Sequence, residues 1–162
     1  MNVEEFNKIR ERYKQKDDLL LAYLAGIIDG EGCIGIECMA PHQKKDGTWI
    51  RKHNYYTPRL TVINTSQEIM TLLSHFFIGG IFDKRKEIPG RKICYRWHIF
   101  GENLEYAIKC LLPYLIIKKE QAELAIKFRE TVGKTGWYVS EETLAIRHNL
   151  YQQCKKLNQV GS

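Results

Sequence analysis

The sequence predicts an α+β domain in which helices cover one face of an antiparallel sheet of about four strands. Apolar and polar residues alternate over 33–40, 58–64 and 92–100, a pattern typical of strands with one buried face. Capping residues and helical spacing mark the segments between and after these strands. At 162 residues and 44% hydrophobic composition, the chain has the size and apolar content of one domain. We therefore expect one domain over 1–162, with a helical extension over 1–17 and a C-terminal helix within 134–162.

The strands are expected in chain order, separated by turns. The first covers 33–40 and is followed by a polar loop at 41–48. Further strand is expected over 49–56 and 58–64, and a hairpin joins 81–86 to 92–100 around Pro89-Gly90.

The helices are placed by spacing and by their ends. Thr65, followed three residues later by Glu68, forms a capping box that predicts a helix to about Phe77. Ser140 caps the last helix, whose first turn holds two glutamates. The other predicted helices cover 3–16, 19–29 (ended by Gly30 and Gly32), 103–112 and 118–132 (closed by Gly133).

Positive charge is concentrated in two windows, 44–59 and 84–96. Eleven Lys and Arg residues against two acids give these windows a net charge of +9, whereas the rest of the chain carries −3. Because the windows fall on predicted strands with polar outward positions, the pattern favours a sheet face that binds a polyanion such as duplex DNA.

Other classes of protein fit the composition poorly. The longest apolar run, 19–28, is half the length that a membrane span needs, and the N-terminus lacks an apolar signal core. We expect an intracellular protein, with cytoplasm, nucleoid and organellar matrix all open. The five cysteines are expected to be reduced thiols, and no Cys or His pair has the spacing of a zinc finger.

Small residues recur every fourth position in the apolar helix over 19–29. Ala22, Gly26 and Gly30 share one face, and Ala25 lies beside Gly26. Such a stripe lets a second backbone approach closely, either a second copy of this helix or the chain's own sheet.

Two acids, Asp29 and Glu31, follow the same helix at the end where its dipole is negative. Carboxylates there are relieved by a hard cation such as Mg²⁺. If the helix pairs with its own copy, two acid tips meet, which is a layout for two-metal hydrolysis of phosphodiesters. Solvated acids after a helix are the alternative.

The stretch Leu24-Ala25-Gly26-Ile27-Ile28-Asp29-Gly30-Glu31-Gly32 resembles the LAGLIDADG motif of homing endonucleases. Two flanking regions agree: 111–122, including Lys118 and Lys119, is similar to the segment that leads to the family's catalytic lysine, and 60–68 is similar to its strand-to-helix junction. The resemblance covers roughly 18–130 and implies a curved sheet with helices on one face and DNA on the other.

Carried over by position, the resemblance implies an active site. Glu31 takes the place of the catalytic, metal-binding acid and the Gly30 carbonyl assists, while Asp29 is either a further ligand or structural. Lys118 matches the active-site lysine, with Lys119 one register away as its rival. Ser66 falls where some members hold a water-ordering residue, but Met70 stands where some carry an arginine, a departure that weakens this part of the comparison.

The predicted protein is a homodimeric, single-motif homing endonuclease that cuts both strands of a long, near-palindromic DNA site. Mg²⁺ or Mn²⁺ is the expected cofactor, and Ca²⁺ should support binding without cleavage. The helix 19–29 is the expected dimer interface, through Ala22, Ala25, Gly26 and Asp29. DNA contacts are expected from outward strand positions and hairpin lysines, with strand parity as the open question: Glu37, Met39, Arg59, Thr61, Lys84, Arg85, Lys86, Lys92, Arg96 and His98.

Three other functions fit parts of the pattern. The same fold also gives intron RNA maturases, and it could serve as a DNA-binding regulator that does not cut. A small metal-dependent hydrolase unrelated to nucleic acid is the third, which the basic strands and the lack of a metal-His motif disfavour.

Overall fold

A computed structural model describes residues 17–85, 89–90, 92–133 and 139–160, so the extension predicted before residue 17 lies outside its described part. Four strands form an antiparallel sheet in the order β1-β4-β6-β5. They are β1 (Gly32–Met39), β4 (Tyr55–Asn64), β5 (Ile81–Lys84) and β6 (Tyr95–Phe100). The expected α+β architecture with a four-stranded sheet is therefore confirmed.

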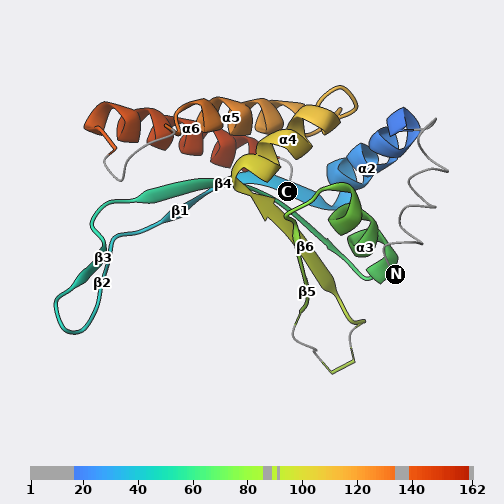
Figure 1. Ribbon diagram of the computed structural model, residues 1–162, viewed down its shortest axis with the longest axis horizontal. Coiled ribbons are helices and arrows are strands. Elements are labelled where there is room, and N and C mark those ends of the chain that lie inside the picture. Colours follow the sequence, from blue (N-terminus) through green and yellow to red (C-terminus); the bar gives the residue numbers. More distant parts are fainter. Residues whose placement is uncertain (1–16, 86–88, 91, 134–138, 161–162) are drawn as a thin grey trace.

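In the described part of the chain, five helices lie over one side of this sheet, and two hairpins extend away from the helical layer (Figure 1). The helices are α2 (Asp17–Glu31), α3 (Gln67–Phe76), α4 (Gly101–Leu111), α5 (Lys119–Glu130) and α6 (Glu141–Val160). One hairpin is formed by β5 and β6, and the other is a small separate sheet of β2 (His42–Gln43) and β3 (Trp49–Arg51). Within the described part of the chain, no helix is both long enough and apolar enough to span a bilayer.

The core forms where the sheet meets the helices. Trp97 of β6 is fully buried beside Phe77, and Leu60 and Val62 of β4 face the same way. Gly80 is required here because a Cβ at this position would lie 2.2 Å from the Trp97 indole nitrogen. A second cluster packs α6 against β1 and β4 around Phe128.

The C-terminal helix α6 is bound to the edge of the sheet. Ser140 accepts a hydrogen bond from the Thr143 amide at 3.2 Å, which confirms the predicted cap. Near the other end of the helix, the Asn158 side chain donates to the Ile34 carbonyl of β1 at 3.0 Å. Helix α6 therefore covers the otherwise open edge strand β1.

Several predicted boundaries were wrong, each for a local reason. Strand was expected over 49–56 and again from 58, but β3 ends at Arg51 and β4 runs unbroken through Pro58. Proline is tolerated there because β6 pairs with β4 only from Arg59 onward, so the missing amide leaves no gap in that ladder.

The ends of three helices and the hairpin also differ from expectation. Helix α2 continues through Gly30 to Glu31, and Ser66, not Thr65, is the N-cap of α3. Helix α5 covers Lys119–Glu130 and ends three residues before Gly133, while β5 and β6 are shorter than the predicted hairpin arms. Helix α2 turns into β1 at Gly32. This position needs glycine because a Cβ here would lie 2.7 Å from the Ile28 carbonyl oxygen.

Candidate nucleic-acid interface and active site

The carboxylate of Asp29, near the end of α2, binds the backbone that leads into α5. Its Oδ2 accepts the amides of Ile116 at 2.8 Å and Ile117 at 3.2 Å, and its Oδ1 accepts the amide of Lys118 at 3.0 Å. These amides lie at the N-terminal, positive end of α5, which favours a negative partner. The structure therefore gives Asp29 a reason for its position that needs no cation, and separates it from Glu31.

The same contact brings Lys118 to the end of α2. Lys118 is the half-buried N-cap of α5, and its Nζ donates a hydrogen bond to the Asp29 carbonyl oxygen. Its rival Lys119 is the first residue of α5 and is exposed. Of the two lysines, Lys118 is therefore the one held beside the acidic helix end.

Glu31 is the exposed last residue of α2, and its carboxylate pairs with no other side chain in the described ranges. Those ranges also contain no group of three or more His, Cys, Asp or Glu residues placed to hold a metal. One free carboxylate with the adjacent Gly30 carbonyl suits Mg²⁺, which binds through one or two carboxylates and takes water or phosphate oxygens for its other ligands. The donor set of one chain therefore fits a divalent cation shared with other oxygen donors.

Ser66 lies at the N-terminus of α3 and has a structural role. Its Oγ accepts the Ile69 amide at 3.3 Å and donates to the Glu68 carboxylate at 2.7 Å. Met70, the position where the sequence resemblance led us to look for an arginine, is fully buried in the core. A solvent-ordering role for Ser66 would have to coexist with its function as a helix cap.

One face of α2 is open to a partner. Ala22 and Gly26 are exposed, and a Cβ added at Gly26 would meet nothing within 4 Å. Leu19 and Tyr23, on the same exposed side, are 67% and 54% exposed. Ala25 is a correction to the predicted interface: its methyl group is fully buried in the chain's own core and is not available to a partner.

The side of the sheet away from the core is here called the open face. Burial alternates along β1, β4 and β6 with the predicted parity, so Glu37, Met39, Arg59, Thr61, Arg96 and His98 all lie on it. Asp83 and Phe100 are two members of this face that sequence reasoning did not single out. Phe100 continues the period of two from Arg96 and His98, whereas Asp83 is placed by the register, which sets it opposite Arg96.

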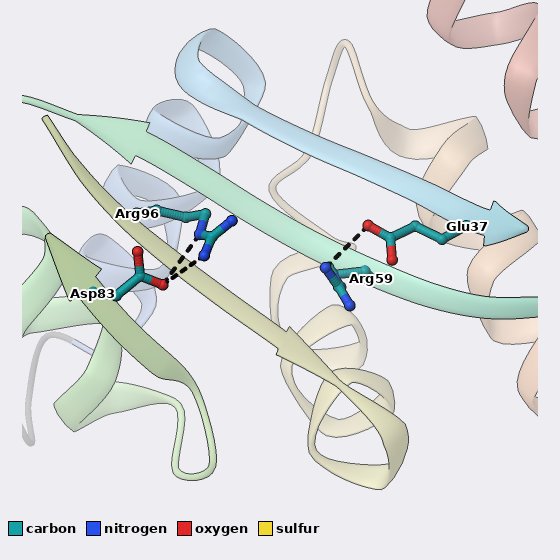
Figure 2. A network of polar contacts seen from close by, with 4 residues as sticks. All are labelled: Glu37, Arg59, Asp83 and Arg96. Carbon is teal, nitrogen blue, oxygen red and sulfur yellow. Dashed lines mark hydrogen bonds and ion pairs between the residues drawn. The ribbon is translucent and has the colours of Figure 1, made fainter. Parts of the chain in front are cut away.

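Two ion pairs span the open face (Figure 2). Arg59 Nη1 lies 3.0 Å from Glu37 Oε1, and Arg96 Nη2 lies 2.9 Å from Asp83 Oδ2. The Arg59 guanidinium also lies over the Phe100 ring at 5.9 Å. Both arginines are thus held by neighbours before any ligand is bound.

His98 lies between these pairs and stacks on Phe100, with the ring centroids 6.2 Å apart. Burial, followed by the positive charges of Arg59 and Arg96, lowers the pKa of His98. Its Nδ1 is buried and has no hydrogen-bond partner in the part of the chain that the structure describes. A neutral imidazole here can both donate and accept hydrogen bonds.

The hairpin lysines occupy the rim of this surface. Lys84 and Lys92 are exposed near the tip of the β5–β6 hairpin, where the Arg85 amide closes the turn on the Cys94 carbonyl at 2.9 Å. Arg85 is also exposed, while Lys86 lies outside the described residues. The hairpin thus adds exposed cations to the edge of the open face.

Comparisons with known proteins agree with this geometry. No protein-family model matches the chain. Over 120 residues, 74% of this chain and 69% of the relative, it is 29% identical to the DNA endonuclease I-CvuI of Chlorella vulgaris. The crystal structure of I-CvuI with its target DNA and Ca superposes with a TM-score of 0.68 and 24% identity, over 87% of this chain and 83% of that one.

Two further structures share the fold at lower identity. The archaeal intron-encoded homing endonuclease I-Vdi141I, bound to DNA, matches with a TM-score of 0.67 and 15% identity over 88% of this chain and 86% of that one. The LAGLIDADG meganuclease I-AabMI, bound to uncleaved DNA, matches with a TM-score of 0.57 and 21% identity, over 80% of this chain and 42% of that one.

Proposed function

Because the chain belongs to the LAGLIDADG homing endonuclease family, we propose that it hydrolyses one phosphodiester bond in each strand of a long, near-palindromic DNA site. The observation that carries the proposal is the placement of exposed Glu31 and half-buried Lys118 together at the end of α2, beside a sheet face with arginine and histidine. A carboxylate for a metal ion and a cation for a phosphate oxygen are the groups that this hydrolysis needs.

Glu31 and the Gly30 carbonyl are the groups of this chain that would hold a divalent metal, Mg²⁺ or Mn²⁺. When bound, such an ion lowers the pKa of water and stabilises charge on phosphate oxygens. Asp29, whose two carboxylate oxygens already accept three amides, instead fixes the segment before α5. Through that segment it fixes Lys118, whose ammonium group can stabilise negative charge that develops on the scissile phosphate.

Cleavage of both strands requires two copies of this site, and one chain has one. We propose that the exposed face of α2, with Ala22, Gly26 and Tyr23, pairs with the same face of a second chain. Asp29 would lie at the end of this interface. A two-fold axis beside α2 and roughly parallel to it would bring two Glu31 side chains to the centre of a palindromic site.

The open face is the proposed DNA-binding surface. A sheet surface of this kind can enter the major groove, where side chains meet base edges. Base contacts are assigned to Glu37, Met39, Arg59, Thr61, Arg96 and His98, and backbone contacts to the hairpin residues Lys84, Arg85, Lys86 and Lys92.

The experiment is cleavage and binding by Glu31→Gln. A library of duplexes incubated with the wild-type protein and Mg²⁺ first identifies a cleaved site. Glu31→Gln should then bind that site in a gel shift with near wild-type affinity and leave it uncut, because the amide keeps the shape of the side chain and loses its charge. In Ca²⁺ the wild-type protein should behave in the same way, binding without cutting.

Glu130→Gln is the matched control, because it removes one acid from an exposed position at the end of α5. It should bind and cut like the wild type. Cleavage by Glu31→Gln at a rate near wild type would overturn the assignment of Glu31. A wild-type protein that binds RNA hairpins and cuts no duplex would overturn the proposed activity.

A further inference from the structure

Asp83 and Arg96 form a side-on ion pair on the open face, between the edge strand β5 and its neighbour β6. They are directly opposite each other in the register of β5 and β6. Arg96 donates to one oxygen, Asp83 Oδ2, from both Nε at 3.1 Å and Nη2 at 2.9 Å (Figure 2). Both side chains stay partly accessible, at 43% for Arg96 and 35% for Asp83, so the pair lies where a ligand can reach it.

The geometry divides the donors of Arg96 into two sets. A guanidinium group has five N–H bonds: one on Nε and two on each Nη. Asp83 takes the Nε–H and one N–H of Nη2. The second N–H of Nη2 and the N–H groups of Nη1 take no part in the pair. One N–H from each of these two nitrogens forms the end of the guanidinium group, and two such parallel N–H groups match O6 and N7 of guanine in the major groove.

The second arginine of this surface is held in a comparable way. Arg59 is bound by Glu37 on one side and lies over Phe100 on the other. The open face therefore carries two arginines, each beside a carboxylate that offsets its charge. Such arginines are poorly suited to phosphate, because a neighbouring carboxylate offsets their charge, and well suited to uncharged base edges.

From these contacts we propose that Asp83 is a positioning residue that orients Arg96 to read guanine and limits its use as a phosphate contact. The inference rests on the proposed function, since it assumes that the open face binds DNA. It predicts that removing Asp83 loosens Arg96: preference for guanine falls, and binding to unrelated DNA rises because a free guanidinium adds positive charge to the surface.

The test is a base-preference profile from a random-sequence duplex library, with binding in Ca²⁺ followed by sequencing. Arg96→Ala identifies the position in each half-site that depends on Arg96. Asp83→Asn should lower the preference for guanine at that position by about tenfold and leave the other positions unchanged. Its affinity for a duplex of unrelated sequence should increase.

Two further variants, Arg96→Lys and Glu105→Gln, are compared with Asp83→Asn in the same assay. Arg96→Lys should lose the preference even with Asp83 present, because an ammonium group lacks the two-pronged edge. Glu105→Gln removes an acid and its ion pair with Lys109 on α4, 2.7 Å in length, and should leave the profile as in the wild type.

Three results would overturn the proposal. Asp83→Asn could give the wild-type profile; it could relax every position, which indicates a structural role; or it could change preference at a different base pair from Arg96→Ala, which indicates that Asp83 contacts a base itself. Failure of the wild-type protein to select any duplex would instead overturn the proposed function.

Discussion

Residues that are close together in this sequence can have different roles, and their contacts distinguish those roles. Asp29 and Glu31 are two positions apart at the end of α2, yet Asp29 accepts three backbone amides whereas Glu31 is exposed. The dipole of α2 disfavours both carboxylates, but the positive end of α5 offsets the cost for Asp29 alone. Glu31 is therefore the acid whose position a cation would explain.

Asp29→Asn should destabilise the protein by about 1.5–3 kcal/mol, the usual range for hydrogen bonds to a charged group. The asparagine side chain can present one oxygen, while its NH₂ group would face an amide donor. Urea unfolding followed by circular dichroism measures the change. Asp46→Asn, in an exposed turn where the carboxylate accepts the Thr48 amide at 2.9 Å, is the control and should cost well under 1 kcal/mol. An equal, small effect at both positions would contradict the role given to Asp29.

The pH dependence of stability should include a contribution from His98. Its pKa in the folded protein lies below the ordinary value of 6.5, chiefly through burial and then through Arg59 and Arg96. The unfolded chain therefore binds the proton more readily, so this contribution to stability is complete above about pH 6.5 and falls as the pH decreases through the range between the two pKa values. His98→Gln should show a weaker loss of stability in the acid range. Identical pH profiles for the two proteins would contradict this.

At the scale of elements, the alternation of apolar and polar residues predicted the features that regular strand pairing determines. The alternation in β1, β4 and β6 fixed which side chains face the core, because a period of two leaves one choice once the apolar side is known. Predicted strand boundaries were wrong where contacts with a neighbouring strand determine them. Strand β4 continues through Pro58 because β6 does not extend that far. The role of Asp29 could not be predicted either, since the amides that it binds are 87 to 89 residues away in the sequence.

The proposed dimer interface on the exposed face of α2 can be tested with Gly26→Ala, because this substitution should change the stability of the isolated chain and of the dimer in opposite directions. Alanine is favoured over glycine inside a helix by about 1 kcal/mol, and a Cβ at Gly26 meets nothing in its own chain. Gly26→Ala should therefore stabilise an isolated chain but weaken a dimer that packs backbones at this point. Sedimentation over a range of concentrations, combined with unfolding at each, separates these effects.

Gly32→Ala is the control for that experiment. Its Cβ would lie 2.7 Å from the Ile28 carbonyl oxygen of the same chain, so it should destabilise the protein at every concentration. The expected wild-type mass is about twice the 19.0 kDa of the chain. A Gly26→Ala protein that is more stable at all concentrations, with an unchanged mass, would contradict the proposed interface.

At the scale of the whole molecule, the helices and the sheet have different roles. The helical layer buries the inner face of the sheet and carries Glu31 and Lys118 at its end, while the two hairpins extend from the opposite side (Figure 1). The charge follows this division, since the windows that hold the hairpins carry a net +9 and the rest of the chain −3. A polyanion would thus be drawn to the side where the sheet is open.

The salt dependence of DNA binding should distinguish the exposed hairpin lysines of that surface from its paired arginines. Each phosphate contact contributes about 0.9 to the slope of log K against log salt concentration, so Lys92→Ala should lower the slope by about that amount per protomer. It should weaken binding to all sequences equally, because phosphate contacts carry no base information. Arg96→Ala should change the slope less and the sequence preference more, since Asp83 already offsets its charge. Lys127→Ala, on the exposed surface of α5 within the helical layer, should alter neither quantity. A slope that responds to Lys127 as strongly as to Lys92 would place the DNA on the wrong side of the molecule.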